Sequence, residues 1–164
     1  TITSVYSYSI YGSNKEKCEA IKSVKQSDLV DLRSYGITCT SSNSCLIKRD
    51  VAEDLKKLDE AYYAKFNKRI SVASAYRSDT QQADTCRTAK GTLCAKPCSQ
   101  GGAGSNHSLG DAVDFSKETI GGCSKTGACS NREFNWLKDP EGGGRFKMYN
   151  KLDDDNPHFS RSGR

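Results

Sequence analysis

The sequence predicts an α+β fold in which a small antiparallel sheet is flanked by helices and stabilised by disulfides. Helical periodicity dominates the first half of the chain, whereas short β-type segments dominate the second half. The two kinds of segment do not alternate regularly, which favours an antiparallel sheet over a parallel one. The chain also has 8 cysteines among its 164 residues, an even number and a high one.

Two helices are expected in the first half of the chain. Residues 15–25 form the first, a short one, because Ala20, Ile21 and Val24 lie on one side of it. Residues 37–44 are rich in Ser, Thr and Asn, and we expect a loop there. The second helix follows this loop, with Asp50 and Glu53 as its N-terminal cap. Its apolar residues recur at spacings of three and four, as one helix face requires: Val51, Leu55, Leu58, Tyr62 and Phe66.

The middle of the chain is expected to form a strand, a helix and a loop. Residues 69–76 alternate in β fashion and predict a strand. A polar helix should begin near Ser78 and run through Gln82. Residues 88–104 contain many Gly and Cys residues and predict a loop.

The last third of the chain is expected to supply most of the strands. Residues 112–115, 146–149 and 158–159 are the candidates. Between the first two, Ser130 to Glu133 has the form of a capping box and precedes an apolar helical segment.

The length of the chain is that of one domain, so we expect residues 1–164 to form a single domain. Residues 1–50 carry no motif, and we expect them to pack on the rest. The first ten residues alternate like a strand and lack the basic start and apolar stretch of a signal peptide, so we treat the chain as mature. No run approaches the roughly 20 apolar residues of a membrane span.

The cysteines indicate disulfides, and therefore a secreted or periplasmic protein. The alternative is a structural zinc site, but only Cys94 and Cys98 approach the spacing such sites use. Eight cysteines allow about 100 pairings, so most cannot be assigned. Cys39 with Cys45 and Cys123 with Cys129 are the natural local pairs.

The net charge of +5 is spread along the chain. No basic run with interleaved aromatic residues occurs, so we expect no nucleic-acid partner. A mild positive charge suits an anionic surface such as a bacterial wall, or only aids solubility.

The chain has only two histidines, and each has informative neighbours. His107 is followed by Gly110, which can form a tight turn, and by a predicted strand that carries Asp114. Ala112 and Asp114 point to the same face of that strand, so Asp114 can approach His107 beside a small side chain. Two histidine nitrogens and one carboxylate are a frequent catalytic zinc set that leaves one coordination position open.

His158 follows a run of three aspartates and Pro157, which stiffens the segment. A carboxylate at Asp155 could face the open metal position instead of binding the metal. By itself, the acidic run is better explained as a solvated loop or a calcium site, although the pattern of an EF-hand is absent.

These segments resemble the family of zinc D-Ala-D-Ala carboxypeptidases and L-alanyl-D-glutamate endopeptidases, which shares its fold with the Hedgehog signalling domain. The family pattern Ser-x-His-x-x-Gly-x-Ala-x-Asp is met from Ser105 to Asp114. Upstream, Ser74-Ala75-Tyr76-Arg77-Ser78 with Gln82 resembles its Tyr-Arg-Ser…Gln element. Downstream, residues 155–159 resemble its acid-x-x-His-aromatic ending.

The resemblance implies a zinc peptidase that cuts peptidoglycan stem peptides, with one Zn²⁺ per chain, and we expect it to act as a monomer. The metal ligands would be His107, Asp114 and His158. Asp155 would be the general base, and Arg77 would meet a developing oxyanion or a substrate carboxylate. The weaker candidates for substrate binding are Ser78, Gln82 and Ser105.

The chain also departs from the family pattern. Pro157 stands where the carboxypeptidase branch commonly has Trp, which favours the endopeptidase, whereas Arg77 suits a free C-terminal carboxylate and favours the carboxypeptidase. Asp155 stands where many relatives have Glu. Two other functions stay open: a non-catalytic zinc-containing binding or signalling module of Hedgehog-like fold, and a disulfide-stabilised inhibitor or toxin without metal.

Overall fold

The computed structural model describes residues 11–41, 44–89 and 94–164. The strand-like segment expected at 1–10 lies outside these residues, as does part of the loop expected at 88–104. No described helix is both long enough and apolar enough to cross a membrane. The helices and strands in chain order are α2 (Asn14–Ser23), β1 (Leu29–Asp31), β2 (Thr38–Cys39), β3 (Leu46–Lys48), α3 (Arg49–Phe66), β4 (Ser71–Ser74), α4 (Asp79–Thr88), α5 (Asn106–Leu109), β5 (Ala112–Phe115), α6 (Arg132–Lys138) and β6 (His158–Ser160).

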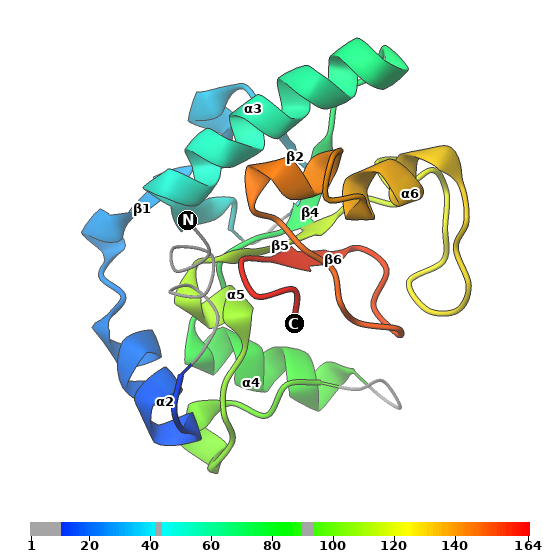
Figure 1. Ribbon diagram of the computed structural model, residues 1–164. Coiled ribbons are helices and arrows are strands. Elements are labelled where there is room, and N and C mark those ends of the chain that lie inside the picture. Colours follow the sequence, from blue (N-terminus) through cyan, green and yellow to red (C-terminus); the bar gives the residue numbers. More distant parts are fainter. Residues whose placement is uncertain (1–10, 42–43, 90–93) are drawn as a thin grey trace.

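The predicted α+β class is confirmed. Four strands form one sheet in the order β2-β4-β5-β6, in which β5 pairs antiparallel with both β4 and β6. The edge strand β2 runs parallel to β4, so the sheet is not wholly antiparallel. A second, two-stranded sheet joins β1 and β3. In Figure 1, α3 and α4 lie on opposite sides of the larger sheet.

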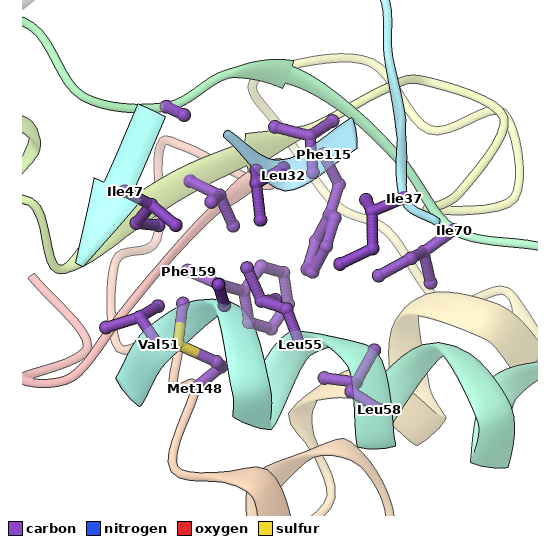
Figure 2. Close-up of a cluster of buried hydrophobic side chains, with 14 of the residues drawn as sticks. Leu32, Ile37, Ile47, Val51, Leu55, Leu58, Ile70, Phe115, Met148 and Phe159 are labelled. Carbon is purple, nitrogen blue, oxygen red and sulfur yellow. The ribbon is translucent and has the colours of Figure 1, made fainter. Parts of the chain in front are cut away.

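The hydrophobic core lies between α3 and one face of the larger sheet. Leu55 of α3 is completely buried and packs with Phe115 of β5 and Phe159 of β6, as Figure 2 shows. Successive residues of a strand point to opposite faces, so the residues that alternate with these two phenylalanines point away from α3. Those residues include Asp114 and His158. The apolar face of β5 and β6 thus anchors the strands, and their polar face is left for a site.

The expected start of the long helix is wrong by two residues. Helix α3 begins at Arg49 with Lys48 as its N-cap, and no side chain caps it. Strand β3 ends at Lys48 and leads directly into the helix, so the chain has no turn in which Asp50 could be the cap. The carboxylate of Asp50 instead lies 3.5 Å from Nη2 of the buried Arg161.

The strand expected at residues 146–149 is also wrong. Residues Gly143–Phe146 form a turn of 3-10 helix, and Tyr149 makes only an isolated bridge with Ser160. The turn is closely packed, because a Cβ at Gly143 would lie 2.5 Å from the carbonyl oxygen of Leu137. Nearby, α6 is capped by Asn131, whose side chain accepts from the Phe134 amide, and not by Ser130. The loop expected at 37–44 contains the short strand β2.

All eight cysteines form disulfides. The two local pairs, Cys39–Cys45 and Cys123–Cys129, are as expected. The other two join parts of the chain that the sequence could not pair. Cys86–Cys94 links α4 to the loop after it, and Cys18–Cys98 links α2 to the same loop across 80 residues.

Candidate metal centre and substrate cleft

The antiparallel pairing of β5 and β6 places Asp114 directly opposite His158. The two side chains share the face that points away from α3, and Oδ1 of Asp114 lies 3.2 Å from Nδ1 of His158. The register of two neighbouring strands, fixed by the core residues beside them, therefore sets one half of the site.

His107 reaches the same carboxylate from the short helix α5. Ser105 caps this helix, since its hydroxyl accepts from the His107 amide at 3.1 Å. Gly110 ends the helix with a positive φ of 76°, and a Cβ there would lie 3.1 Å from Cγ of Lys48, so glycine suits the position on both counts. The tight turn brings Nε2 of His107 to 3.3 Å from Oδ1 of Asp114.

The outer nitrogen of each histidine is held by a backbone carbonyl. Nδ1 of His107 lies 2.7 Å from the Ala75 oxygen, and Nε2 of His158 lies 2.9 Å from the Arg164 oxygen. A ring nitrogen that donates to a carbonyl leaves the opposite nitrogen as a lone-pair donor. The lone pairs of Nε2 in His107 and Nδ1 in His158 then both point at Asp114.

His107, Asp114 and His158 fit a divalent metal ion. One donor atom from each lies within 4.8 Å of the others. Burial tends to raise the pKa of Asp114, but the two histidines hold it well below its usual range. Burial lowers the pKa of His107, which favours the neutral ring that a metal needs. For His158 burial acts the same way, but the hydrogen bond to Asp114 raises its pKa overall.

Arg77 lies beside this group. It follows β4, and its amide donates to the carbonyl of His107 at 3.2 Å. Its Nη2 lies 3.8 Å from Oδ2 of Asp114. Burial lowers the pKa of the guanidinium, against the opposing charges of Asp114 and Asp155. Its buried Nε has no hydrogen-bond acceptor within the described part of the chain. Buried donors are normally paired, so this one is available to a substrate.

Asp155 enters the site from the turn before β6. Burial, and then the charge of Asp114, raise the pKa of its carboxyl group. Its Oδ1 is buried and accepts no hydrogen bond from any described residue. The turn itself is firmly held, because the Asn150 side chain donates to the carbonyls of Asp155 and Asn156 at 3.0 Å. No sequence motif pointed to this role for Asn150.

The three weaker candidates have different positions. Ser105 and Gln82 line the cleft around the metal ligands, whereas Ser78 is not among the lining residues. The Ser78 hydroxyl instead caps α4 by accepting from the Gln81 amide at 3.1 Å. Gln82 is buried, and its amide donates to the Ala95 carbonyl at 2.9 Å, while its Oε1 has no partner among the described residues.

The cleft has a volume of about 790 Å³ and extends well beyond the three candidate metal ligands. Besides the residues expected from the sequence, it exposes two lysines from distant segments, Lys17 of α2 and Lys125 of the loop after β5. Neither lysine belongs to a recognisable motif. The acidic residues Asp153 and Asp154 line it beside Asp155.

Comparison with solved structures agrees with the fold. A solved structure of the LD-carboxypeptidase LdcB superposes with a TM-score of 0.60 at 18% identity, covering 84% of this chain and 69% of that one. A Zn(II) complex of a mutant of the vancomycin-resistance D,D-pentapeptidase VanY, from a VanB-type resistance cassette, has a TM-score of 0.50 at 22% identity, covering 82% and 78%. At these identities the likeness concerns the fold. No curated protein matches the sequence.

The family model gives the assignment. Residues 44–156, which include His107, Asp114 and Arg77 and most of the described elements, match the model of the VanY D-alanyl-D-alanine carboxypeptidases. This match spans well over half of the chain. The protein therefore belongs to the VanY D-alanyl-D-alanine carboxypeptidase family.

Proposed function

We propose that this protein is a zinc-dependent peptidase that hydrolyses peptidoglycan stem peptides, with residues 1–164 as one peptidase domain. The observation that carries the proposal is that His107, Asp114 and His158 converge beside two polar atoms, the Nε of Arg77 and the Oδ1 of Asp155. Neither atom has a hydrogen-bond partner among the described residues. The family match and the LdcB structure, described as revealing the basis of peptidoglycan recognition, support the substrate class.

His107, Asp114 and His158 would hold the zinc ion, one per chain. Bound zinc lowers the pKa of water to about 7 and polarises a carbonyl group. The histidine orientations are set by the carbonyls of Ala75 and Arg164, so the chain provides a preorganised donor set.

Asp155 would act as the general base and then as the general acid. It would take a proton from the attacking water and pass it to the leaving amine. Its raised pKa and its unpaired Oδ1 suit both roles, because the carboxylate accepts a proton more readily than an exposed aspartate does. The turn around it, held by Asn150, keeps the carboxylate in the cleft.

Arg77 would bind the negative charge of the substrate. Its guanidinium lies beside Asp114, so a peptide bound at the metal brings its reacting carbonyl or its C-terminal carboxylate close to Arg77. A planar guanidinium can form two hydrogen bonds with either group. Ser105 and Gln82, which line the same cleft, would help to position the peptide.

Among the stem-peptide bonds, we favour the one before a C-terminal D-alanine. The family description and the place of Arg77 both support a carboxypeptidase. The alternative is an L-alanyl-D-glutamate endopeptidase, which Pro157 favours because the carboxypeptidase branch commonly has Trp at this position. The non-catalytic zinc module is less well supported, because such a module has no use for the carboxylate of Asp155, whose buried Oδ1 has no hydrogen-bond partner among the described residues.

Digestion of purified peptidoglycan, followed by mass spectrometry of the fragments, tests the proposal. A carboxypeptidase releases free D-alanine and leaves the stem otherwise intact, whereas the endopeptidase separates stem from glycan at L-alanine. Metal analysis of the same preparation should give one zinc per chain. No cleavage by a zinc-loaded preparation would refute the enzymatic function and leave the binding module.

We further propose that the protein acts outside the cytoplasm, in a secreted or periplasmic location. Four disulfides in a chain of this size support an oxidising compartment, and the proposed wall substrate lies in the same compartments.

A further inference from the structure

The wall of the cleft on the side of Lys17 includes two segments that carry no family motif, α2 and the loop 94–104, and the helix α4, whose Gln82 belongs to one. The N-terminal helix α2, the helix α4 and the loop 94–104 meet there, next to α5 with its metal ligand His107. Lys17, Thr85, Cys94, Ala95 and Gly104 line the cleft from these segments.

This wall is cross-linked at several points. Cys18–Cys98 ties α2 to the loop, and Cys86–Cys94 ties α4 to it. The Asp79 carboxylate accepts from the amides of Cys98 and Ser99 at 2.7 and 2.8 Å, which adds a third link. The side chain of Gln82 adds a fourth through Ala95. A surface loop without function does not need so many constraints, whereas a binding wall gains affinity when it is preorganised.

Gly104 shows how closely α2 approaches the cleft. Its φ is 76°, and a Cβ there would lie 2.4 Å from Cδ1 of Ile21 and 2.8 Å from Sγ of Cys98. Helix α2 therefore packs directly on the backbone that leads into Ser105 and His107. One residue earlier than Cys18 on the same helix, Lys17 donates from Nζ to the Gly104 carbonyl at 3.3 Å.

This hydrogen bond fixes the ammonium group of Lys17 at the rim of the metal site. Lys17 is partly buried, and burial lowers its pKa while the charge of Asp111 opposes that change. Asp111 does not neutralise it by direct contact, because among the described residues only Lys48 lies within ion-pair distance of that carboxylate, at 4.0 Å. The Gly104 carbonyl takes one of the three donors of Nζ, and the described residues offer no other acceptor.

We propose that Lys17 is a specificity-determining residue that binds a side-chain carboxylate of the peptide substrate, away from the bond that is cut. The inference rests on the proposed function. Arg77 is beside the metal ligands and serves the reacting end of the peptide, whereas Lys17 stands on the wall, in a cleft large enough for several residues. A peptide that contains glutamate keeps one carboxyl group out of its chain bonds, and this group is the ligand that we assign to Lys17.

Lys125, on the loop that precedes α6, is the competing residue. It also lines the cleft and lies close enough to Asp155 to lower the pKa of that carboxyl group. Its side chain is exposed, and no described acceptor holds it in place. A mobile exposed lysine contributes less to binding than one that is already fixed and partly desolvated. Lys17 is therefore the better candidate.

The test compares two synthetic stem peptides that differ in one group, a free or an amidated glutamate carboxyl. Wild-type protein should show a KM about 10-fold higher for the amide, as expected for the loss of one charged hydrogen bond. Lys17→Met should raise KM for the acid by a similar factor, leave kcat within about threefold, and discriminate little between the peptides. Lys17→Arg should restore part of the preference.

Lys15→Met is the matched control, because Lys15 is exposed on the same helix and does not line the cleft. It should behave like wild type. Lys17→Gln is a second replacement if Lys17→Met folds poorly. If Lys17→Met and Lys17→Gln discriminate between the acid and the amide peptide as strongly as wild type does, the proposal is overturned. Discrimination that disappears in Lys125→Met instead would also overturn it and assign the carboxylate to Lys125.

Equilibrium binding of the same two peptides, measured by calorimetry, separates this inference from the proposed function. If wild type binds but cuts neither peptide, the enzymatic function fails, and a preference for the acid that depends on Lys17 still supports the carboxylate site. If neither peptide binds, the Lys17 site is refuted.

Discussion

Asp114 and His158 face each other across β5 and β6, with 3.2 Å between Oδ1 of the first and Nδ1 of the second. The same carboxylate oxygen lies 3.3 Å from Nε2 of His107. Three donors therefore converge on one point, and two of them are set by strand register. Residues Phe115 and Phe159, on the opposite face of the same strands, maintain that register by packing against α3.

Replacing one histidine should remove metal and activity together. With His107→Ala or His158→Ala, only two protein donors remain, and we expect zinc content after dialysis to fall well below one per chain. Asp153→Asn is the control, because Asp153 lines the cleft but is not in the donor group. Elemental analysis measures the outcome. Stoichiometric zinc in both histidine variants would contradict the ligand assignment.

Asp155→Asn should keep the fold and the zinc but lose turnover. General acid–base groups typically contribute about 10²–10⁴-fold, so kcat should fall in that range. The exposed neighbour Asp154, which lines the same cleft, provides the control Asp154→Asn. Steady-state kinetics with parallel metal analysis would show the difference. If Asp155→Asn turns over normally, the base is another residue, and Asp154 is the next to be tested, since Glu133 does not line the cleft and is ion-paired with Lys68.

Even the conservative replacement of Arg77 by lysine should lower the activity. Arg77→Ala should lower kcat/KM by about 10²–10³-fold, as removal of an oxyanion donor does. Arg77→Lys should recover little of this, because lysine lacks the planar two-pronged donor. Arg87→Lys, on the exposed side of α4, is the control.

Substrates with a free or an amidated C-terminus distinguish the two groups that Arg77 could bind, the C-terminal carboxylate and the reacting carbonyl. If it grips the C-terminal carboxylate, amidation of that group should weaken binding to wild type and matter less to Arg77→Lys. An equal loss in both proteins would mean that Arg77 acts on the reacting carbonyl instead.

The native protein should contain no free thiol, and its disulfides should differ in their contribution to stability. Loop-closure entropy predicts that Cys18–Cys98, which spans 80 residues, stabilises the fold by about 2 kcal/mol more than Cys39–Cys45, which spans 6. Denaturant unfolding of the two double Cys→Ser variants measures this difference. Thiol titration in denaturant, with and without reductant, checks the oxidation state. Four or more thiols without reductant would contradict the extracytoplasmic assignment.

Alanine substitutions at two glycines of the loop 94–104 distinguish the cost of backbone strain from the cost of close packing. Gly101 and Gly104 have nearly the same positive φ, 78° and 76°, but an added Cβ has no neighbour within 4 Å at Gly101 and lies 2.4 Å from Ile21 at Gly104. Gly101→Ala should cost about 1–2 kcal/mol of stability through its backbone alone. Gly104→Ala should cost clearly more and also raise KM, because it moves α2 and Lys17. Equal costs would show that α2 can shift freely.

Local features were predictable because they depend on neighbours in the sequence. The spacing of Val51, Leu55 and Leu58 defines a buried helix face whatever the rest of the chain does. Gly110, between His107 and Asp114, permits a turn that any tertiary context would preserve. The local disulfides follow from the same reasoning, since residues six apart in a loop are easily joined. Even so, the cap expected at Asp50 was wrong, because the strand β3 runs straight into the helix.

The features that only the tertiary structure decided are contacts between residues far apart in the sequence. The sequence alone places His107 and Asp114 in one motif and shows a second histidine, His158. Only the resemblance to a family assigns the three to one metal site. The pairing of β5 with β6, which puts His158 at that motif, is a packing outcome. Cys18–Cys98 and the place of Lys17 in the cleft have no local signal at all. Bringing such distant segments together costs loop-closure entropy, and the burial of Ile21, Leu55, Phe115 and Phe159 across the whole fold offsets it.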